Sequence, residues 1–403
     1  MQAKTVLVIA APGQGAQTSG FLAPWLELPG FAARLEAWSE LAGCDLIRAG
    51  TTADADEIRD TAVAQPLLVA AALAAALDEV ITGAHPVSRV SVAVAGHSVG
   101  ELAAGVLAEV ISPEDAMRLV RVRAQGMAAA AAAEQTGMTA VLGGDEAGVL
   151  AAIEAHGLTP ANVNGAGQIV AAGTMVQLAA FAASPPAGAR LRPLSVAGAF
   201  HTHHMAPAVD ALAAAAQTVG VADPVRPLFS NRDGAVVKSG PDWLDRIINQ
   251  VSAPVRWDMC MQTMESLGVT ALIELPPGGT LTGLAKRALR GIQVVALKTP
   301  ADLDAARELL AEHADSHDDH DAPDWRLLVA SHGGTFRAPD GHPETPGPGT
   351  VVGLDTDLGY IEVRGGNHAV AATFPATVIE WLVEDGDPVS PGQPLLRLFP
   401  DAQ

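Results

Sequence analysis

A serine stands in the middle of the segment Gly96-His97-Ser98-Val99-Gly100, which fits the pattern G-x-S-x-G. A serine hydroxyl is a weak nucleophile unless the backbone holds it exposed and a base removes its proton during attack. In this pattern the serine occupies a sharp turn between a strand and a helix, and the two glycines let the backbone pass closely. The segment therefore predicts a nucleophilic Ser98, with the N-terminal amides of the following helix near a developing oxyanion.

Histidines are the first candidates for the base that such a serine needs. His97 is adjacent to Ser98, but neighbouring side chains on a tight turn point apart, so it is the weaker candidate. The cluster of His201, His203 and His204 supplies three more, and it also offers nitrogen ligands for zinc. No nearby thiolate or suitably spaced carboxylate supports a metal site, so we expect no bound metal.

The segments around Ser98 predict an α/β fold. Residues 5–11 (TVLVIAA) and 91–95 (SVAVA) are short apolar runs that end in glycine-containing turns, and residues 66–80 have the apolar spacing of a helix. Apolar runs without alternation are typical of strands covered on both faces, as in parallel sheets. We therefore expect an α/β-hydrolase-like parallel-sheet core in which Ser98 directly follows a strand.

Residues 135–196 have a pattern of their own. A strand at 139–142 is followed by a helix, a hairpin, a second helix and a last strand at 190–196. This β-α-β-β-α-β order is the ferredoxin-like pattern. We expect a small ferredoxin-like subdomain inserted into the larger one.

The C-terminal quarter differs from the rest in charge and in pattern. Residues 1–298 hold 26 acidic and 19 basic side chains, whereas residues 299–403 hold 19 acidic and 5 basic ones. The stretch 299–325 contains EHADSHDDHDAPDW, which is acidic and has no apolar periodicity, so we interpret it as a flexible linker. From Arg326 onward, short β-runs are broken by glycine and proline, which predicts a separate all-β domain over 326–403.

The composition excludes several classes of function. A formal net charge of −21 opposes binding to nucleic acid or to an anionic membrane surface. Cys44 and Cys260 are the only cysteines and stand in unrelated contexts, so neither a disulfide framework nor a cysteine-rich metal site is expected. The N-terminal apolar run is shorter than that of a signal peptide, and no apolar stretch is long enough to span a bilayer. We expect a cytoplasmic protein.

The motif GHSVGE at 96–101 resembles the nucleophile motif of malonyl-CoA:acyl carrier protein transacylases and of polyketide synthase acyltransferase domains. Seven further motifs follow that family's order over residues 5–298, which makes coincidence a poor explanation, and 1–298 is expected to be the acyltransferase domain. They are PGQGAQ at 12–17, Gln65-Pro66, Arg123, NVN at 162–164 with GQ at 167–168, GAFH at 198–201, Asn249-Gln250 before PVRW at 254–257, and ELPPGGTLTGLAKR at 274–287.

The resemblance implies a role for each matching residue. Ser98 would take the acyl group from the thioester, and His201 would be its general base and then the acid that protonates the leaving thiol. Gln250 marks the segment whose backbone carbonyl would orient that histidine. The backbone N–H groups of Gln14 and Val99 would form the oxyanion hole.

Arg123 would hold the malonyl carboxylate through a two-pronged ion pair, for which a guanidinium is better suited than a lysine. Gln65, His97, Asn164 and Phe200 are expected to complete the pocket.

Two residues bear on the acyl group that is accepted. In this family an H-A-F-H segment resembles malonyl selection, and Y-A-S-H resembles methylmalonyl selection. The present segment is GAFH, with Gly198 in place of the first histidine. Phe200 beside the base would leave little room for an α-methyl group, and the small Val99 after Ser98 also fits the malonyl type.

Residues 326–403 resemble the biotinyl/lipoyl carrier domain, a flattened β-barrel. The best matches are Gly334-Thr335-Phe336 with Pro339, and VEDGDPVSPGQPLLRL at 383–398. The alignment places the hairpin tip at 363–367 and the attachment lysine at about Gly365. Both cofactors attach through a lysine amide, and the last lysine of the chain is Lys298. We therefore expect no biotin or lipoate, and a docking module, an oligomerisation module or a relic instead.

Together these features predict transfer of a malonyl group from malonyl-CoA to an acyl carrier protein, in fatty acid or polyketide synthesis, without a permanently bound cofactor. An editing acyl-hydrolase is the enzymatic alternative, and Arg123 argues against it because an uncharged acyl group has no use for that cation. A non-catalytic scaffold is the third hypothesis, and the intact Ser98 and His201 argue against it.

Docking of the carrier protein requires a local basic patch, because carrier proteins are acidic and this chain is acidic too. The candidates are Lys286, Arg287, Arg190 and Arg192.

Overall fold

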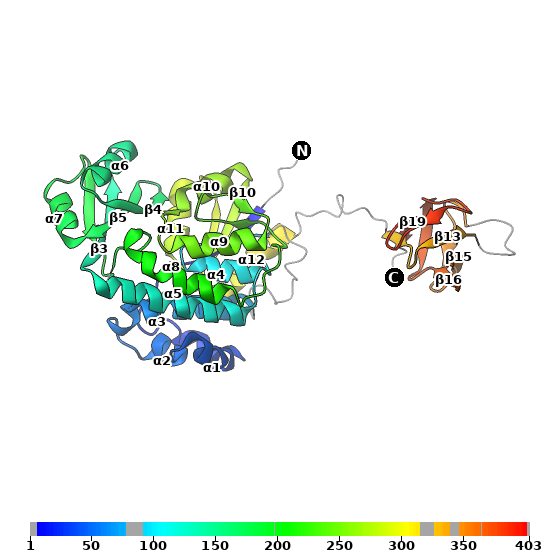
Figure 1. Ribbon diagram of the computed structural model, residues 1–403, viewed down its shortest axis with the longest axis horizontal. Helices are drawn as coiled ribbons and strands as arrows, with labels where there is room; N and C mark the ends of the chain where they lie inside the picture. The colour runs from blue at the N-terminus through cyan, green and yellow to red at the C-terminus, as the bar shows by residue number, and fades with distance from the viewer. Residues whose placement is uncertain are drawn as a thin grey trace. The chain divides into compact units, whose positions relative to one another are not determined.

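The computed structural model describes residues 6–77, 92–196, 198–314, 326–338, 346–363 and 365–400. The chain divides into two compact units, residues 1–316 and 317–403 (Figure 1). Each unit has its own hydrophobic core. Several positions named above lie outside the described residues: Thr5, 78–80, Ser91, Pro339 and the second half of the predicted linker.

A six-stranded sheet organises the first unit, in the order β11-β10-β1-β2-β7-β8. The strands are β1 (Val6–Ala11), β2 (Val92–Gly96), β7 (Leu228–Phe229), β8 (Val236–Val237), β10 (Val269–Glu274) and β11 (Gln293–Ala296). Neighbours from β11 to β7 are parallel, and β8 pairs antiparallel with β7 at the edge. The predicted parallel α/β core is confirmed, with one antiparallel edge strand added.

Strand β1 is buried on both faces, as its unbroken apolar run indicates. Leu7 and Ile9 belong to one core cluster, whereas Val8 and Ala10 belong to another on the opposite face. The first cluster is shared with α1 (Phe31–Ala42), α2 (Leu46–Thr51), α3 (Thr61–Ala75), α4 (Gly100–Leu107), α5 (Pro113–Ala133), α8 (Ala206–Ala216) and α9 (Gly240–Gln250). The second is shared with α10 (Trp257–Ser266) and α11 (Thr280–Ala288).

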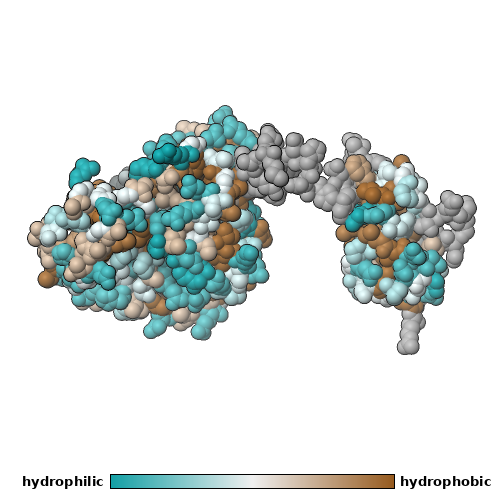
Figure 2. All heavy atoms as spheres, turned by 90° about the horizontal axis from the view of Figure 1, so that it is seen from above, coloured by the Kyte–Doolittle hydropathy of each residue, from teal (hydrophilic) through white to brown (hydrophobic). Residues whose placement is uncertain are grey.

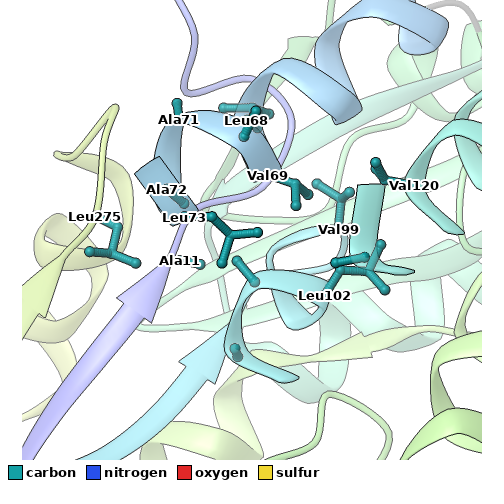
Figure 3. Close-up of a cluster of buried hydrophobic side chains, with 14 of the residues drawn as sticks. Ala11, Leu68, Val69, Ala71, Ala72, Leu73, Val99, Leu102, Val120 and Leu275 are labelled. Carbon is teal, nitrogen blue, oxygen red and sulfur yellow. The ribbon is translucent and has the colours of Figure 1, made fainter. Parts of the chain in front are cut away.

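Helix α3 begins earlier than the expected start at residue 66. The side chain of Asp60 accepts a hydrogen bond from the backbone N–H of Ala62, so it caps the helix and places Pro66 inside it. Side chains of α3, β1 and α4 meet in one apolar cluster around Val69 and Val99 (Figure 3). Packing against both neighbours favours the helix despite the backbone hydrogen bond that a proline cannot donate.

The predicted β-α-β-β-α-β order is present over residues 136–193. Its elements are β3 (Thr136–Gly143), α6 (Glu146–Ala155), β4 (Thr159–Gly165), β5 (Gln168–Thr174), α7 (Met175–Ala183) and β6 (Ala189–Pro193). The sheet order is β6-β3-β5-β4-β9, in which β9 (Val255–Arg256) pairs parallel with β4. This fifth strand comes from outside the insertion, and it ties the subdomain to the rest of the unit.

The predicted linker 299–325 is wrong in its first half. Residues Leu303–Ala314 form helix α12, which packs on the first unit through Leu303, Ala306, Leu309 and Leu310, all at most 6% exposed. These side chains recur at helical spacing and lie on one face, so burying them orders the segment. His313 extends the same face, and its Nε2 lies 3.0 Å from the hydroxyl of Thr270 on β10.

The second unit contains two four-stranded sheets, ordered β12-β19-β17-β14 and β16-β15-β13-β18. Its strands are β12 (Arg326–Val329), β13 (Gly334–Arg337), β14 (Val351–Val352), β15 (Asp357–Val363), β16 (Gly366–Ala371), β17 (Ala376–Trp381), β18 (Pro388–Val389) and β19 (Pro394–Pro400). All of their pairings are antiparallel, and β15 and β16 form a hairpin whose last pair is Val363 with Gly366. The turn at this hairpin includes Gly365.

Hydrophobic side chains also reach the surface of the second unit, as Figure 2 shows. They are Leu327, Val329, Val351, Leu354, Leu382 and Phe399. Among the described residues of the whole chain, no helix combines the length and apolarity needed to cross a membrane.

Candidate active site

Ser98 lies in the tight turn between β2 and α4, where the sequence pattern predicts it. Its φ of 53° is in the left-handed region, which is strained for a residue with a side chain. The turn needs a glycine at position 100, because a Cβ there would lie 2.3 Å from the carbonyl oxygen of Ala11 on the neighbouring strand. The fold thus uses close packing of β1 and α4 to keep the serine in a conformation that it would not adopt alone.

His201 is the histidine that the fold brings to Ser98. Its Nε2 lies 2.7 Å from Ser98 Oγ, and its Nδ1 lies 2.8 Å from the backbone carbonyl of Gln250. Because a carbonyl only accepts, Nδ1 carries the proton, and neutral Nε2 is the acceptor for the serine hydroxyl. This is the arrangement of a general base held by a backbone carbonyl at Gln250, as the resemblance implied.

The segment that carries His201 is held against the small subdomain. The backbone N–H of Ala199 donates to the hydroxyl of Thr136, and the hydroxyl of Thr202 donates to the carbonyl of Ala199. Gly198, which replaces the family's histidine, packs closely on α5, because a Cβ there would lie 2.5 Å from that of Ala131. A larger side chain at this position requires a shift of the helix or of the segment.

Burial keeps His201 neutral. Burial, followed by the positive charge of Arg123, lowers the pKa of the imidazole to about 3, whereas the hydrogen bond to Gln250 acts in the opposite direction. A histidine with such a low pKa is available as a base throughout the neutral range.

Arg123 projects from α5 to the same serine and is 1% exposed. Its Nη2 donates to Ser98 Oγ at 3.2 Å and to Gln250 Oε1 at 3.2 Å, and its Nη1 donates to Gln65 Oε1 at 2.6 Å. Burial lowers the pKa of Arg123 to about 10, and Glu101 opposes that shift, so the guanidinium stays charged at neutral pH. A fixed cation beside the nucleophile is suited to a substrate that carries a carboxylate near the reacting carbon.

Two residues at this site were not singled out from the sequence. Asn231 accepts the backbone N–H of Ser98 at 2.7 Å through Oδ1, and Glu101 is a buried carboxylate in the first turn of α4. The signal for Glu101 was its place within GHSVGE, and the signal for Asn231 was its place just after β7, at the same sheet edge as Ser98. Strand β7 has two residues, too short for its pattern to be recognised.

A cleft of about 560 Å³ opens over Ser98 between the two subdomains of the first unit. Its walls include six residues predicted for the site: Gln14, Gln65, His97, Asn164, Phe200 and His201. The backbone N–H groups of Gln14 and Val99 lack a protein acceptor within the described residues, which leaves both available to a ligand oxygen. The side chain of Val99 is buried in the core (Figure 3), so its size does not act on the acyl group as expected from the sequence.

The remaining histidines have other partners. His97 Nε2 lies 2.9 Å from Asn164 Oδ1, its ring packs on Trp257, and burial lowers its pKa. His204 Nδ1 lies 2.7 Å from a carboxylate oxygen of Glu134. No group of three or more metal-ligating side chains occurs in the part of the chain that the structure describes.

The predicted docking residues are exposed but do not line the cleft. Lys286 and Arg287 lie at the C-terminal end of α11, and Arg190 and Arg192 lie on the edge strand β6. Arg287 contacts a residue of the cleft wall, because its Nη2 donates to Oε1 of Gln168 at 3.4 Å.

The fold and the site together define a serine-dependent acyl transferase. The family described as "Acyl transferase domain" matches residues 10–313, a range that includes α12 except for its last residue, Ala314.

Named relatives narrow this class. The malonyl CoA-acyl carrier protein transacylase of Mycobacterium tuberculosis is 53% identical over 304 residues, which is 75% of this chain and 100% of that protein. The transacylase of the same name from Escherichia coli K12 is 33% identical, over 76% of this chain and all of its own length. The chain belongs to the malonyl CoA-acyl carrier protein transacylase family.

Solved structures agree. The Mycobacterium tuberculosis enzyme superposes with a TM-score of 0.71, covering 75% of this chain and 99% of that one, at 53% identity. A malonyl-transacylase solved in complex with its type II polyketide acyl-carrier protein superposes with a TM-score of 0.68 at 30% identity, covering 76% and 99% of the two chains.

Proposed function

We propose that this chain transfers a malonyl group from malonyl-CoA to an acyl carrier protein in fatty acid synthesis, by way of a malonyl ester on Ser98. The single observation that carries the mechanism is the contact set of the Ser98 hydroxyl oxygen. His201 lies 2.7 Å from it and Arg123 Nη2 lies 3.2 Å from it. Relatives that are more than 50% identical over their whole length are named for this activity.

Acylation begins when Ser98 Oγ attacks the thioester carbonyl and passes its proton to Nε2 of His201. The negative charge that develops on the carbonyl oxygen is received by the backbone N–H groups of Gln14 and Val99, the latter at the N-terminus of α4. Collapse of the intermediate breaks the carbon–sulfur bond, and His201 returns the proton to the leaving thiolate. The product is a malonyl-Ser98 ester and coenzyme A.

Deacylation runs the same steps with the carrier protein's thiol as nucleophile. His201 removes the thiol proton, the thiolate attacks the ester carbonyl, and the proton returns to Ser98 Oγ as the ester breaks. Arg123 binds the malonyl carboxylate in both halves, which orients the ester. That cation also supports transfer over the alternative of editing hydrolysis, since uncharged acyl groups gain nothing from it.

Carrier docking on the basic residues is part of this proposal. The acidic carrier is expected to approach over α11 and β6, where Lys286, Arg287, Arg190 and Arg192 are exposed. The structure of a related transacylase bound to its carrier supports the class of partner. A cytoplasmic location and the absence of a permanently bound cofactor belong to the same proposal.

The second unit is proposed to be a biotinyl/lipoyl-like barrel that carries neither cofactor. Two antiparallel four-stranded sheets and a hairpin turn at Gly365 support the likeness. Residues 299–403 contain no lysine, so the attachment chemistry has no amine to use. An interaction or oligomerisation role remains the expectation for this unit.

Intact-mass measurement of the full chain tests the reaction. Incubation with malonyl-CoA is expected to add one malonyl group to the protein, and later addition of a carrier protein bearing its phosphopantetheine thiol is expected to remove it. The carrier must gain what the chain loses. Label that leaves the chain without appearing on the carrier would support the hydrolase instead.

A further inference from the structure

A buried carboxylate, Glu101, lies three residues after Ser98 in the first turn of α4. Glu101 is 2% exposed, and both of its oxygens receive a donor. The backbone N–H of Asn231 donates to one oxygen at 2.9 Å, and Nε2 of Gln250 donates to the other. Both contacts bring a donor to the carboxyl group, so each of its oxygens acts as a hydrogen-bond acceptor.

Gln250 is the link between this carboxylate and the groups that touch Ser98. A carboxamide has a donor at one end and an acceptor at the other. Because Glu101 accepts from Nε2, Oε1 must face the opposite side, where it accepts from Arg123 at 3.2 Å. A carboxamide turned the other way would point its NH₂ group at the guanidinium, so that two donors would face each other. The backbone carbonyl of the same residue holds His201.

Asn231 forms a second link. Its backbone N–H is bound to Glu101, its Oδ1 accepts the backbone N–H of Ser98 at 2.7 Å, and its Nδ2 donates to the carbonyl of Gly96 at 2.8 Å. The strained turn is therefore held from the side opposite the cleft by a residue that Glu101 anchors.

Burial and the neighbouring positive charges act in opposite directions on the pKa of Glu101. Glu101 is the charged residue that raises the pKa of Arg123 against the effect of burial. Burial raises the pKa of Glu101 to about 8, with Asp233 acting in the same direction. The Asn231 N–H and the charges of Arg123 and Arg246 oppose that shift.

We infer that Glu101 is a positioning residue for malonyl transfer: it fixes the Gln250 carboxamide in the orientation that holds Arg123 beside Ser98 to receive the acyl carboxylate. The inference rests on the proposed function, because it assigns the carboxylate of the acyl group to Arg123. It predicts that damage at Glu101 is felt by an acyl group that carries a carboxylate, and much less by one that does not.

The test compares the rates at which Ser98 is acylated by malonyl-CoA and by acetyl-CoA, followed by intact mass, in the full chain and in Glu101→Gln. Glutamine keeps the shape and the acceptor for Asn231, but presents an NH₂ group to Nε2 of Gln250, which forces that carboxamide to turn. Loss of one hydrogen bond to a charged group predicts a fall of about 10- to 100-fold with malonyl-CoA. The rate with acetyl-CoA should change much less. Glu114→Gln, on the exposed first turn of α5, is the matched control.

An equal fall with the two thioesters, or no fall with either, overturns the inference. Such a result is distinct from failure of the proposed function, in which the unaltered chain itself is not labelled by malonyl-CoA.

If Glu101→Gln folds poorly, a second pair of variants tests the orientation of the Gln250 carboxamide through stability. Gln250→Glu alone places two carboxylates face to face, whereas Glu101→Gln combined with Gln250→Glu restores one donor opposite one acceptor. The double variant is expected to unfold at a higher temperature than Gln250→Glu alone. A double variant that is no more stable than the less stable single variant overturns the orientation on which the inference depends.

Discussion

The two units of this chain differ in what they bury. The first unit encloses a charged arginine, a carboxylate, a histidine and several amides around Ser98, whereas every buried side chain among the described residues of the second unit is apolar. Burying polar groups costs free energy unless each finds a partner, and the first unit provides those partners one by one. The buried polar groups around Ser98 are therefore held in place by their partners, whereas the described part of the second unit buries no polar side chain that could act in a reaction.

The largest expected effect follows from removing the nucleophile. Ser98→Ala should abolish labelling by malonyl-CoA, because no other hydroxyl has a base aligned with it at this site. Intact mass after incubation is the measurement. Ser195→Ala, an exposed serine on the wall of the same cleft, is the control and should be labelled normally. Label that persists on Ser98→Ala would show that another residue is the nucleophile, and the buried polar groups around Ser98 would then no longer mark the active site.

Removal of the buried cation Arg123 should have the second largest effect on activity. Arg123→Ala should weaken malonyl transfer by about 2–5 kcal/mol in kcat/KM, because the charged substrate loses its ion pair, while acetyl transfer falls much less. Arg121→Ala on the same helix, at the surface, is the matched control. Equal losses with malonyl-CoA and acetyl-CoA would show that Arg123 serves the fold and not the carboxylate.

The preference for malonyl over methylmalonyl groups should be a smaller effect than the loss of Arg123. With Phe200 on the cleft wall beside the base, we expect kcat/KM for malonyl-CoA to exceed that for methylmalonyl-CoA by about 10- to 200-fold, the usual cost of one excluded methyl group. Phe200→Ala should narrow the ratio, whereas Val99→Ala should leave it unchanged because that side chain lies in the core. Comparable values for the two thioesters in the unaltered chain would remove Phe200 as the selecting residue.

The dependence of activity on pH tests whether burial keeps His201 neutral. His201 acts as a base only when neutral, and its pKa of about 3 predicts that kcat/KM stays level from pH 8 down to about pH 5. Since the Arg123 charge lowers this pKa, Arg123→Ala should raise it, so that activity with acetyl-CoA starts to fall at a higher pH on the acid side. Arg121→Ala should leave the profile in place. If the pH at which activity falls on the acid side is the same in Arg123→Ala as in the unaltered chain, the charge of Arg123 does not set the pKa of His201.

The smallest expected effect is that of deleting the second unit. A chain that ends at Ser316 should keep its rate of self-malonylation and of transfer to carrier protein, and removal of the acidic tail should leave transfer unchanged or faster at low salt. A chain that ends at Thr299 is the control, and it should unfold at a much lower temperature because it loses α12, whose buried leucines contribute about 1.5–3 kcal/mol each. Self-malonylation without transfer in the Ser316 variant would make the second unit the docking site.

The boundary between the units shows where reading the sequence failed. The acidic, histidine-bearing stretch before Arg326 suggested a linker from residue 299. The apolar spacing of Leu303, Ala306, Leu309 and Leu310 was the signal for a helix, but an amphipathic segment of 12 residues is marginal by itself and folds only against a partner surface. The same limit applies to β9, a two-residue strand that no local pattern distinguishes.

What the sequence by itself determined is the local chemistry: the turn at Ser98, the parallel core, the order of elements in the inserted subdomain, and, through the family motifs, the pairing of Ser98 with His201 and Arg123. These depend on residue types and short spacings, which are visible along the chain. Only the tertiary structure decided that Val99 faces the core, that α12 closes the first unit, and that Glu101 and Asn231 support the site. Those outcomes depend on which segments, far apart in sequence, exclude water from one another, and burial is the largest cause of the low pKa that keeps His201 neutral and able to act as a base.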